Sequence, residues 1–350
     1  MKYRKFGNTD LNVSVICLGT MTFGEQNNQQ DGFDQMDYAL ERGVNFFDTA
    51  ELYAVMPRKE TYGLTEEVIG NWFSKRKNRD KVILASKIAS KSDGLEWIRG
   101  GSESLGFDLK NMSEAIDASL KRLKTDYIDL YQLHWPERKV PRFGQLDYKY
   151  DPSDNSWTSI EEVLYNLDQL VKVGKIRYVG LSNETPWGMM KFLQVAKEKN
   201  LPRMMSIQNV YSLVNRVFDI AHSEISIAEN FGLLAYSPLA GGRLSGKYIG
   251  EKNPKNSRYT LWPRRFSRHN TERGEVAIEK YVNLAKKYGI APSTFANAFV
   301  NDRPFVTSNI IGATTMDQLK ENIDSIDIVL SEEMLKEIEN IHLNDPNPCV

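Results

Sequence analysis

Short apolar runs alternate with longer amphipathic stretches along almost the whole chain. The short runs are rich in β-branched and aromatic residues, which is typical of buried strands. They predict strands at 13–18, 44–48, 82–87, 127–134, 176–181, 205–210, 233–236 and 309–311. Apolar residues spaced by three and four positions between these runs predict helices near 30–43, 64–76, 112–124, 159–173, 187–199, 217–230, 274–288 and 315–326.

The stretch at 159–173 shows the helical pattern most clearly. Apolar side chains recur at Ile160, Val163, Leu164 and Leu167, which places them on one face of a helix. The preceding helix is expected to be capped by Ser113, because a serine ahead of an apolar periodic stretch is a common N-terminal cap.

Eight strand–helix pairs in a chain of 350 residues are typical of a (β/α)8 TIM barrel. The near-continuous apolar strands agree with this fold, because parallel strands are buried on both faces. We expect one domain over residues 1–350, with an N-terminal hairpin within residues 2–12 and long rim loops at 135–157 and 239–273. An open, doubly wound parallel sheet is the alternative that the pattern leaves open.

Composition narrows the class of partner. The chain carries 45 basic and 46 acidic residues, so it gives no electrostatic reason to expect nucleic acid or an anionic membrane. No apolar run approaches the roughly 20 residues of a membrane span, and no signal peptide is evident. Two distant cysteines, Cys17 and Cys349, form neither a disulfide framework nor a zinc pattern. We therefore expect a cytoplasmic protein without a metal.

Four reactive residues stand at or just after three successive strand runs. Asp48 and Tyr53 follow the run at 44–48, Lys87 ends the next run, and His134 ends the third. In a barrel of parallel strands these ends meet at one rim. A lysine beside a tyrosine lowers the pKa of the phenol, a carboxylate keeps that lysine charged, and an imidazole can hydrogen-bond a substrate oxygen. This set suits carbonyl reduction, and a cofactor must supply the hydride.

Each of the four residues also has a simpler explanation. Tyr53 could be a half-buried loop aromatic, Lys87 a surface lysine, His134 a structural histidine and Asp48 a helix or turn cap. Their joint placement at the ends of successive strands favours the functional interpretation, because four reactive side chains rarely gather there by chance.

The segment from Gly43 to Tyr53, GVNFFDTAELY, resembles the aldo-keto reductase signature that holds the catalytic Asp and Tyr. Lys87 and His134 match the family's other two catalytic positions. The similarity continues in order through residues 180–183, 208, 236–239, 311–314 and 318–322. Within the family the chain is most similar to the bacterial Tas-like proteins and the potassium-channel β-subunit branch, which residues 245–248, SGKY, also support.

The resemblance implies that NADP(H) lies extended across the barrel rim, without a Rossmann fold. No Gly-x-Gly-x-x-Gly follows a strand, which agrees with this. It implies nicotinamide contacts from Thr20, Met21, Asp48, Ser182, Asn183, Gln208 and a stacking Tyr236. It further implies phosphate contacts from Ser237, Pro238, Leu239, Ala240, Gly242, Lys247 and Arg258, and adenosine contacts from Gly312, Thr314, Gln318, Glu321 and Asn322.

The chain departs from the family around the adenosine 2′-phosphate. Many members place a Lys and an Arg there, whereas this chain has Gly312 and Gln318. The channel-subunit branch also has Gln at that position and still resembles an NADP binder, and Arg258 is the candidate to compensate. The resemblance thus implies NADP rather than NAD.

We accordingly predict an NADPH-dependent reductase of an aldehyde or ketone, with Tyr53 as general acid, acting as a monomer or homo-oligomer. One alternative is a regulatory protein that holds the cofactor and barely turns over. Another is a lyase in which Lys87 forms a Schiff base. The substrate depends on loops at 22–30, 54–63, 88–110, 135–157 and 259–273, which the sequence does not shape.

Overall fold

The computed structural model describes residues 1–350 except 101–104, 251, 253 and 264–266. The rim loops expected at 88–110 and 239–273 therefore lie partly outside the described residues. Within that part, eight parallel strands close into a barrel in the order β10-β3-β4-β5-β6-β7-β8-β9. They are β3 (Ile16–Gly19), β4 (Phe46–Asp48), β5 (Ile83–Ile88), β6 (Ile128–Leu133), β7 (Ile176–Ser182), β8 (Met204–Val210), β9 (Gly232–Tyr236) and β10 (Val306–Ile311).

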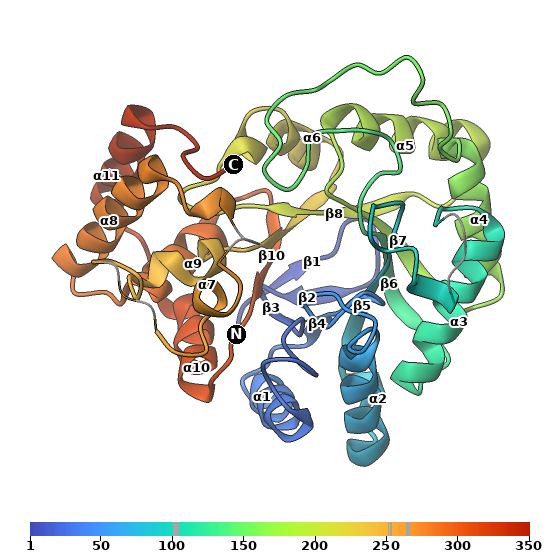
Figure 1. Ribbon diagram of the computed structural model, residues 1–350, viewed down its shortest axis with the longest axis horizontal. Helices are drawn as coiled ribbons and strands as arrows, with labels where there is room; N and C mark the ends of the chain where they lie inside the picture. Colours follow the sequence, from blue (N-terminus) through green and yellow to red (C-terminus); the bar gives the residue numbers. More distant parts are fainter. Residues whose placement is uncertain (101–104, 251, 253, 264–266) are drawn as a thin grey trace.

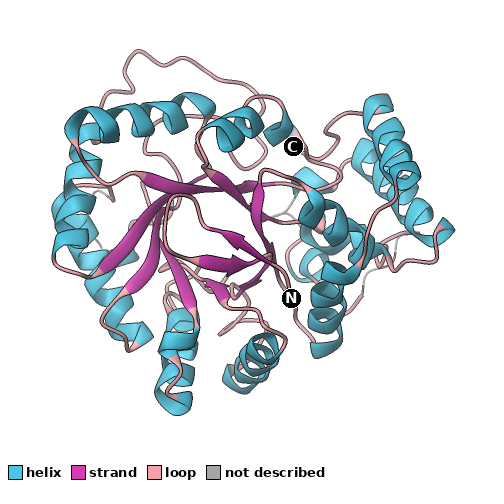
Figure 2. Ribbon diagram, turned by 180° about the vertical axis from the view of Figure 1, so that it is seen from behind, coloured by secondary structure: helices cyan, strands magenta, loops and turns pink. Residues whose placement is uncertain are grey.

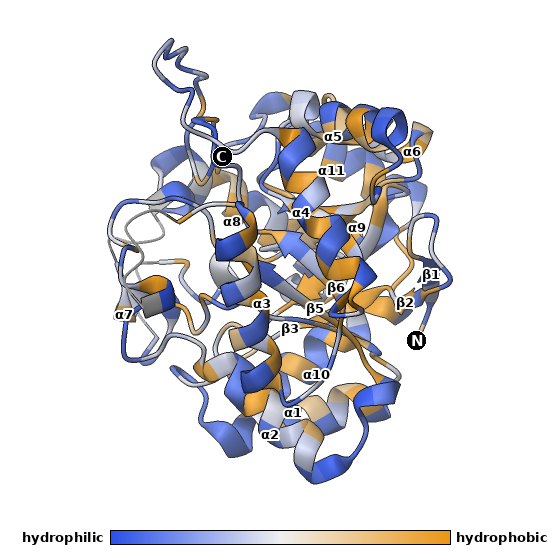
Figure 3. Ribbon diagram, turned by 90° about the vertical axis from the view of Figure 1, so that its right-hand side faces the viewer, coloured by the Kyte–Doolittle hydropathy of each residue, from blue (hydrophilic) through white to orange (hydrophobic). Residues whose placement is uncertain are grey.

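Helices surround this ring of strands (Figures 1 and 2). They are α1 (Gln29–Glu41), α2 (Leu64–Arg76), α3 (Leu109–Leu123), α4 (Ile160–Lys172), α5 (Pro186–Lys199), α6 (His222–Ala228), α7 (Arg258–Leu261), α8 (Glu272–Lys287), α9 (Pro292–Asp302), α10 (Met316–Asp324) and α11 (Glu332–Asn344). Most carry both hydrophilic and hydrophobic residues (Figure 3), as amphipathic helices on a barrel must. The (β/α)8 barrel is confirmed, and the open doubly wound sheet is excluded because the strands close.

One expectation about a helix was wrong. The cap of α3 is Asp108, whose carboxylate accepts the backbone N–H of Asn111, and Ser113 lies inside the helix. In α3, Asp108 precedes Ser113 by five positions, and an aspartate caps a helix as well as a serine does, so the apolar pattern alone misplaced the start of this helix. The helix expected near 274–288 is present as α8, which packs against α9 and α11, whereas α9, which was not expected, packs on β10.

An antiparallel hairpin of β1 (Tyr3–Lys5) and β2 (Asn12–Ser14) precedes the barrel, as expected. Its buried Phe6 and Leu11 pack against Phe46, Leu130 and their inward-facing neighbours on the other strands. The hairpin therefore fills the end of the barrel interior opposite the rim where the strands finish.

Inward positions change character along each strand. Side chains two residues apart share a face of a strand. Phe46 and Leu130 belong to the apolar interior cluster, and two residues further on each strand come the buried Asp48 and Gln132. The barrel is thus apolar towards the hairpin and polar at the carboxyl rim, where a TIM barrel carries its site.

Among the described residues, none of the helices combines the length and the apolar character that crossing a membrane requires.

Candidate active site

Parallel pairing brings the ends of β4, β5 and β6 side by side. The register places Asp48 opposite Ala85 and Lys87 opposite Gln132. His134 directly follows β6, and its backbone N–H donates to the carbonyl of Ile88. Asp48, Lys87 and His134 therefore meet at one rim, and Tyr53 lies in the loop that follows Asp48. We call Asp48, Tyr53, Lys87 and His134 the tetrad.

Lys87 is the buried centre of the tetrad. Its side chain is 0% exposed. Its Nζ lies 2.7 Å from Asp48 Oδ2, 2.8 Å from the carbonyl oxygen of Thr49 and 3.3 Å from Tyr53 Oη. Burial lowers the pKa of the ammonium, but the charges of Asp48 and Tyr53 and their hydrogen bonds outweigh burial, so the pKa is raised. Lys87 is therefore a charged, fixed donor, and the surface-lysine explanation is excluded.

Asp48 links the ammonium to the barrel interior. Its Oδ1 accepts hydrogen bonds from Gln208 Nε2 at 2.8 Å and Gln132 Nε2 at 3.2 Å, while Oδ2 faces Lys87. Its backbone carbonyl accepts the hydroxyl of Thr20 at 2.8 Å. A carboxylate with these partners is neither a helix cap nor a turn cap, and it holds the lysine in one place.

Tyr53 points its phenol towards Lys87, with the ammonium 4.8 Å from the ring centroid. The nearby positive charge lowers the pKa of the phenol, in the direction expected from the sequence, but desolvation is larger and the net shift is upward. The expected lowering of the pKa is thus wrong for the protein alone. Lys87 forms an ion pair with Asp48, and the negative charge of Asp48 raises the pKa of Tyr53.

The His134 imidazole lies edge to face with Tyr53, with 5.9 Å between ring centroids. The His134 ring also contacts the Trp135 ring, with 4.8 Å between ring centroids. Burial, and then the charge of Lys87, lower the pKa of His134 well below its usual range. The imidazole is therefore neutral at neutral pH and carries one N–H donor. Its Nδ1 has no hydrogen-bond partner among the described residues.

A second polar cluster adjoins the tetrad at the ends of β7, β8 and β9. Ser182 Oγ donates to the carbonyl of Gln208 at 2.9 Å, and Tyr236 Oη donates to Asn183 Oδ1 at 2.7 Å. Asn183 Nδ2 in turn donates to the carbonyl of His134 at 2.9 Å. The structure therefore brings these four predicted cofactor residues together, and Gln208 joins them to Asp48.

The predicted phosphate segment follows β9. Residues 237–242 turn sharply, with φ of 49° at Ala240, 69° at Gly241 and 94° at Gly242. A Cβ at Gly242 would stand 3.4 Å from Lys247 Nζ, so the missing side chain lets the ammonium lie against the backbone. Arg258, at the start of α7, lies close enough to Tyr53 for their charges to interact. Ser237, Pro238 and Leu239 lie in the same turn.

The predicted adenosine residues gather after β10. Gln318 Oε1 accepts the backbone N–H of Thr314 at 3.0 Å, and Asn322 Nδ2 donates to the carbonyl of Gly312 at 3.1 Å. Glu321 accepts the hydroxyl of Ser293, on α9. Apart from Gly312 and its two chain neighbours, no heavy atom of the described residues lies within 4 Å of the position of a Cβ on Gly312.

The predicted adenosine residues adjoin the loop that follows β3. Asn27 Nδ2 donates to the carbonyl of Thr314 at 3.0 Å. In the same loop, the carbonyl of Met21 accepts the backbone N–H of Val55 at 2.9 Å. The rim from Thr20 to the adenosine group is therefore continuous across β3 and β10.

Two features at the site were not predicted. Gln132 bonds Asp48, and its spacing of two residues from His134 would have placed it on the same inward face. Glu51 and Arg99 form a buried ion pair, with 2.5 Å between carboxylate and guanidinium, behind the loop that carries Tyr53. The sequence gives no sign of this pair, because 48 positions separate its members.

Comparison with known proteins agrees with this geometry. The sequence profile of the Aldo/keto reductase family matches residues 15–342. The chain is 46% identical to Protein tas of Escherichia coli (strain K12), with 98% of each chain covered. It is 34% identical to the uncharacterized oxidoreductase YrpG of Bacillus subtilis, with 97% of this chain and 96% of that one covered.

A more distant relative is norsolorinic acid reductase B of Dothistroma septosporum, 29% identical over 97% of this chain and 81% of that protein. The similarity to the Tas-like branch expected from the sequence is confirmed. The barrel and these similarities lead to one conclusion: the chain belongs to the aldo/keto reductase family, whose members reduce small carbonyl compounds.

Proposed function

We propose that this protein reduces an aldehyde or ketone to an alcohol with NADPH, and that Tyr53 donates the proton. The observation that carries the proposal is the short chain of contacts from Asp48 through the Lys87 ammonium to the Tyr53 hydroxyl, at 2.7 Å and 3.3 Å. A phenol held against a fixed cation, beside a neutral imidazole, is a proton donor placed next to a hydrogen-bond donor.

The residues at the rim suit an extended dinucleotide. Ser182, Asn183 and Gln208 would hold the nicotinamide carboxamide, since they offer amide and hydroxyl groups, and Tyr236 would stack on the ring. Lys247 against the backbone of Gly242 would hold phosphate.

At the far end of the rim, the open space beside Gly312 would admit the adenosine, with Gln318, Glu321 and Asn322 around it. Thr20, Met21 and Asp48 would border the nicotinamide ribose, and Arg258 would supply charge. NADP is preferred over NAD in this proposal.

Bound NADPH supplies the hydride in this chemistry. His134 donates a hydrogen bond to the substrate carbonyl oxygen and fixes its direction. As the oxygen gains negative charge, Tyr53 transfers its proton to it. The phenolate that remains is stabilised by the Lys87 ammonium, 3.3 Å away, and Asp48 keeps that ammonium charged. In the reverse direction Tyr53 acts as the base.

The alternative in which Lys87 forms a Schiff base is disfavoured by the same contacts. A nucleophilic lysine needs a lowered pKa and a free lone pair. The pKa of Lys87 is raised, and its Nζ donates to Asp48, Thr49 and Tyr53. Borohydride trapping with a carbonyl compound is expected to leave Lys87 unmodified.

The decisive test is Tyr53→Phe. We expect kcat for aldehyde reduction to fall by about 10²–10⁴-fold, the usual contribution of a general acid, while the Kd for NADPH stays within about twofold. Tyr178→Phe is the matched control, because its phenol bonds Asp10 away from the rim. Unchanged reduction by a folded, NADPH-binding Tyr53→Phe variant would refute the role of Tyr53.

Titration with NADPH and NADH, followed by intrinsic fluorescence, tests the cofactor. Tighter binding of NADPH supports the proposal, and failure to bind either nucleotide refutes it. Tight binding without turnover on a broad carbonyl panel would favour the regulatory alternative. We also propose that residues 1–350 form one domain and that the protein acts in the cytoplasm, as a monomer or homo-oligomer.

A further inference from the structure

Most arginines among the described residues form an ion pair with a carboxylate. Six largely buried arginines form ion pairs of 3.2 Å or shorter: Arg79, Arg99, Arg122, Arg138, Arg216 and Arg243. Arg142 and Arg268 differ, since neither forms an ion pair within 4.0 Å with any described residue. Both lie on segments that reach the rim of the barrel.

Arg142 is a partly buried cation on the long loop between β6 and α4. Its guanidinium lies 5.6 Å from the ring centroid of Trp135 and 5.8 Å from that of Phe143. Nη1 donates to the carbonyl of Pro136 at 3.0 Å. The pKa of Arg142 is lowered by burial, with no acidic group acting against it. An arginine has five N–H donors, so most donors of Arg142 face no acceptor among the described residues.

The position of Arg142 relates it directly to the tetrad. Trp135, the ring under its guanidinium, is also the ring 4.8 Å from the His134 imidazole. Only one indole therefore separates this cation from the group that we propose to orient the substrate carbonyl. A substrate reaching from His134 past Trp135 would meet the guanidinium.

Arg268 approaches the same place from the segment before α8. Its guanidinium carbon lies 5.9 Å from the ring centroid of Tyr236, the residue whose hydroxyl bonds Asn183. Its Nε donates to His269 Nε2 at 3.1 Å. A Cβ on Gly144 would stand 3.4 Å from Cβ of Arg268, so the loop that carries Arg142 touches Arg268. The two cations thus lie on adjoining segments, Arg142 beside Trp135 and Arg268 beside Tyr236.

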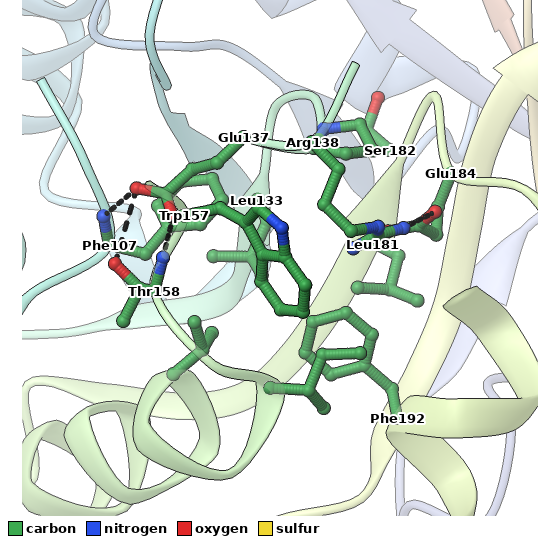
Figure 4. A pocket seen from close by; sticks show the side chains of 13 residues that line it. Phe107, Leu133, Glu137, Arg138, Trp157, Thr158, Leu181, Ser182, Glu184 and Phe192 are labelled. Carbon is green, nitrogen blue, oxygen red and sulfur yellow. Dashed lines mark hydrogen bonds and ion pairs between the residues drawn. The ribbon is translucent and has the colours of Figure 1, made fainter. Parts of the chain in front are cut away.

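The loop that carries Arg142 is fixed at its base, although it has no regular structure (Figure 1, the green segment at the top). Glu137 accepts the backbone N–H groups of Phe107 at 2.8 Å and Thr158 at 2.5 Å. Arg138 pairs with Glu184 at 2.5 Å, across a cavity of about 20 Å³ between the ends of β6 and β7 (Figure 4). A cavity of that size holds about one water and no substrate, so this ion pair serves as an anchor.

We propose that the carbonyl substrate carries a carboxylate, and that Arg142 and Arg268 bind this carboxylate while His134 and Tyr53 face the carbonyl. The proposal rests on the reductase function proposed above and names its substrate class. Guanidinium groups hydrogen-bond carboxylates through two parallel N–H donors. The rings of Trp135, Phe143 and Tyr236 next to the cations suit a flat or apolar link between the two ends of the substrate.

The test compares 4-carboxybenzaldehyde with its methyl ester, which has the same aldehyde and no charge. We expect the wild type to prefer the acid, and Arg142→Met to lower kcat/KM for the acid by about 10- to 100-fold, as loss of a charged hydrogen bond predicts. The ester should change little. Arg142→Lys should restore part of the preference, and Arg268→Met should act like Arg142→Met.

Arg42→Met, a remote and exposed arginine paired with Asp324, is the matched control and should alter neither substrate. Equal losses for acid and ester in Arg142→Met and Arg268→Met would overturn the proposal, as would no preference for the acid in the wild type. Added salt should reduce the preference for the acid, because exposed charges are screened.

Binding of terephthalate to the NADP-loaded protein, measured by calorimetry, separates this proposal from the reductase proposal. If neither aldehyde is reduced, the reductase function fails, but terephthalate binding that weakens at least tenfold in Arg142→Met still supports the carboxylate site. No terephthalate binding by the wild type would overturn it.

Discussion

The buried ion pair behind the tyrosine loop gives the sharpest prediction about stability. Glu51 and Arg99 are 0% and 1% exposed, and 2.5 Å separates their charged atoms. Glu51 also accepts the backbone N–H of Ala89 at 2.7 Å and the hydroxyl of Tyr62 at 3.0 Å. Its carboxylate therefore ties the loop after β4, which holds Tyr53, to the loop after β5.

Replacing Arg99 by Met would leave the Glu51 carboxylate buried without its cation. Breaking a buried pair from one side typically costs about 3–5 kcal/mol. We expect the lower end, about 3 kcal/mol, because the N–H of Ala89 and the hydroxyl of Tyr62 still bond Glu51. The free energy of unfolding should be measured by urea denaturation, followed by tryptophan fluorescence and circular dichroism.

Arg42→Met is the control with the same substitution in an exposed pair. Arg42 and Asp324 are 33% and 54% exposed, so losing their pair should cost about 0–1 kcal/mol. The double variant Glu51→Gln, Arg99→Met should cost less than the sum of its single variants by at least about 1 kcal/mol. The reasoning is refuted if Arg99→Met costs no more than Arg42→Met, or if the two single effects add.

Three further predictions follow from pKa shifts and packing. Reduction needs a protonated Tyr53, whose pKa is raised, and a neutral His134, whose pKa is lowered. The value of kcat/KM should therefore not change with pH from about pH 6.5 to 10. A titration of kcat/KM inside that window would contradict this prediction. The pKa of buried His269 lies well below its usual range, so below about pH 6.5 the unfolded state binds a proton that the folded state does not. Stability should then fall as pH drops from 7 to 5.5, and more shallowly in His269→Gln; an unchanged slope would argue against it. A Cβ on Gly70 would stand 2.1 Å from the carbonyl oxygen of Arg122, where α2 packs on α3. Gly70→Ala should therefore destabilise the protein by about 1–3 kcal/mol in a thermal melt. Wild-type stability of this variant would mean that the two helices move apart at no cost.

The barrel was predictable because its strands are short, apolar and regularly spaced, and because parallel strands must be buried on both faces. Helix α9 was not predicted, for a clear physical reason. Its residues are buried almost throughout, including the polar Ser293, Asn297 and Asn301, so its polar positions do not mark a solvent-facing side as they do in a surface helix. Its buried polar groups are satisfied by distant partners, such as Asn297 with Asn322 and Asn309.

Helix α11 is a different case, since Leu335, Ile338 and Ile341 carry helical spacing that the sequence does show. It lies beyond the eight strand–helix pairs that a barrel requires, so the barrel pattern gave no reason to expect it.

The sequence by itself determined the order of strands, the rim at which Asp48, Tyr53, Lys87 and His134 gather, and the family, because these depend on local periodicity and on short motifs. Only the tertiary structure decided the energetics at that rim. Closure of the barrel brings Gln208 to Asp48 across 160 positions and buries Lys87 completely. Burial, which no local pattern reports, then outweighs the lysine charge and raises the pKa of Tyr53.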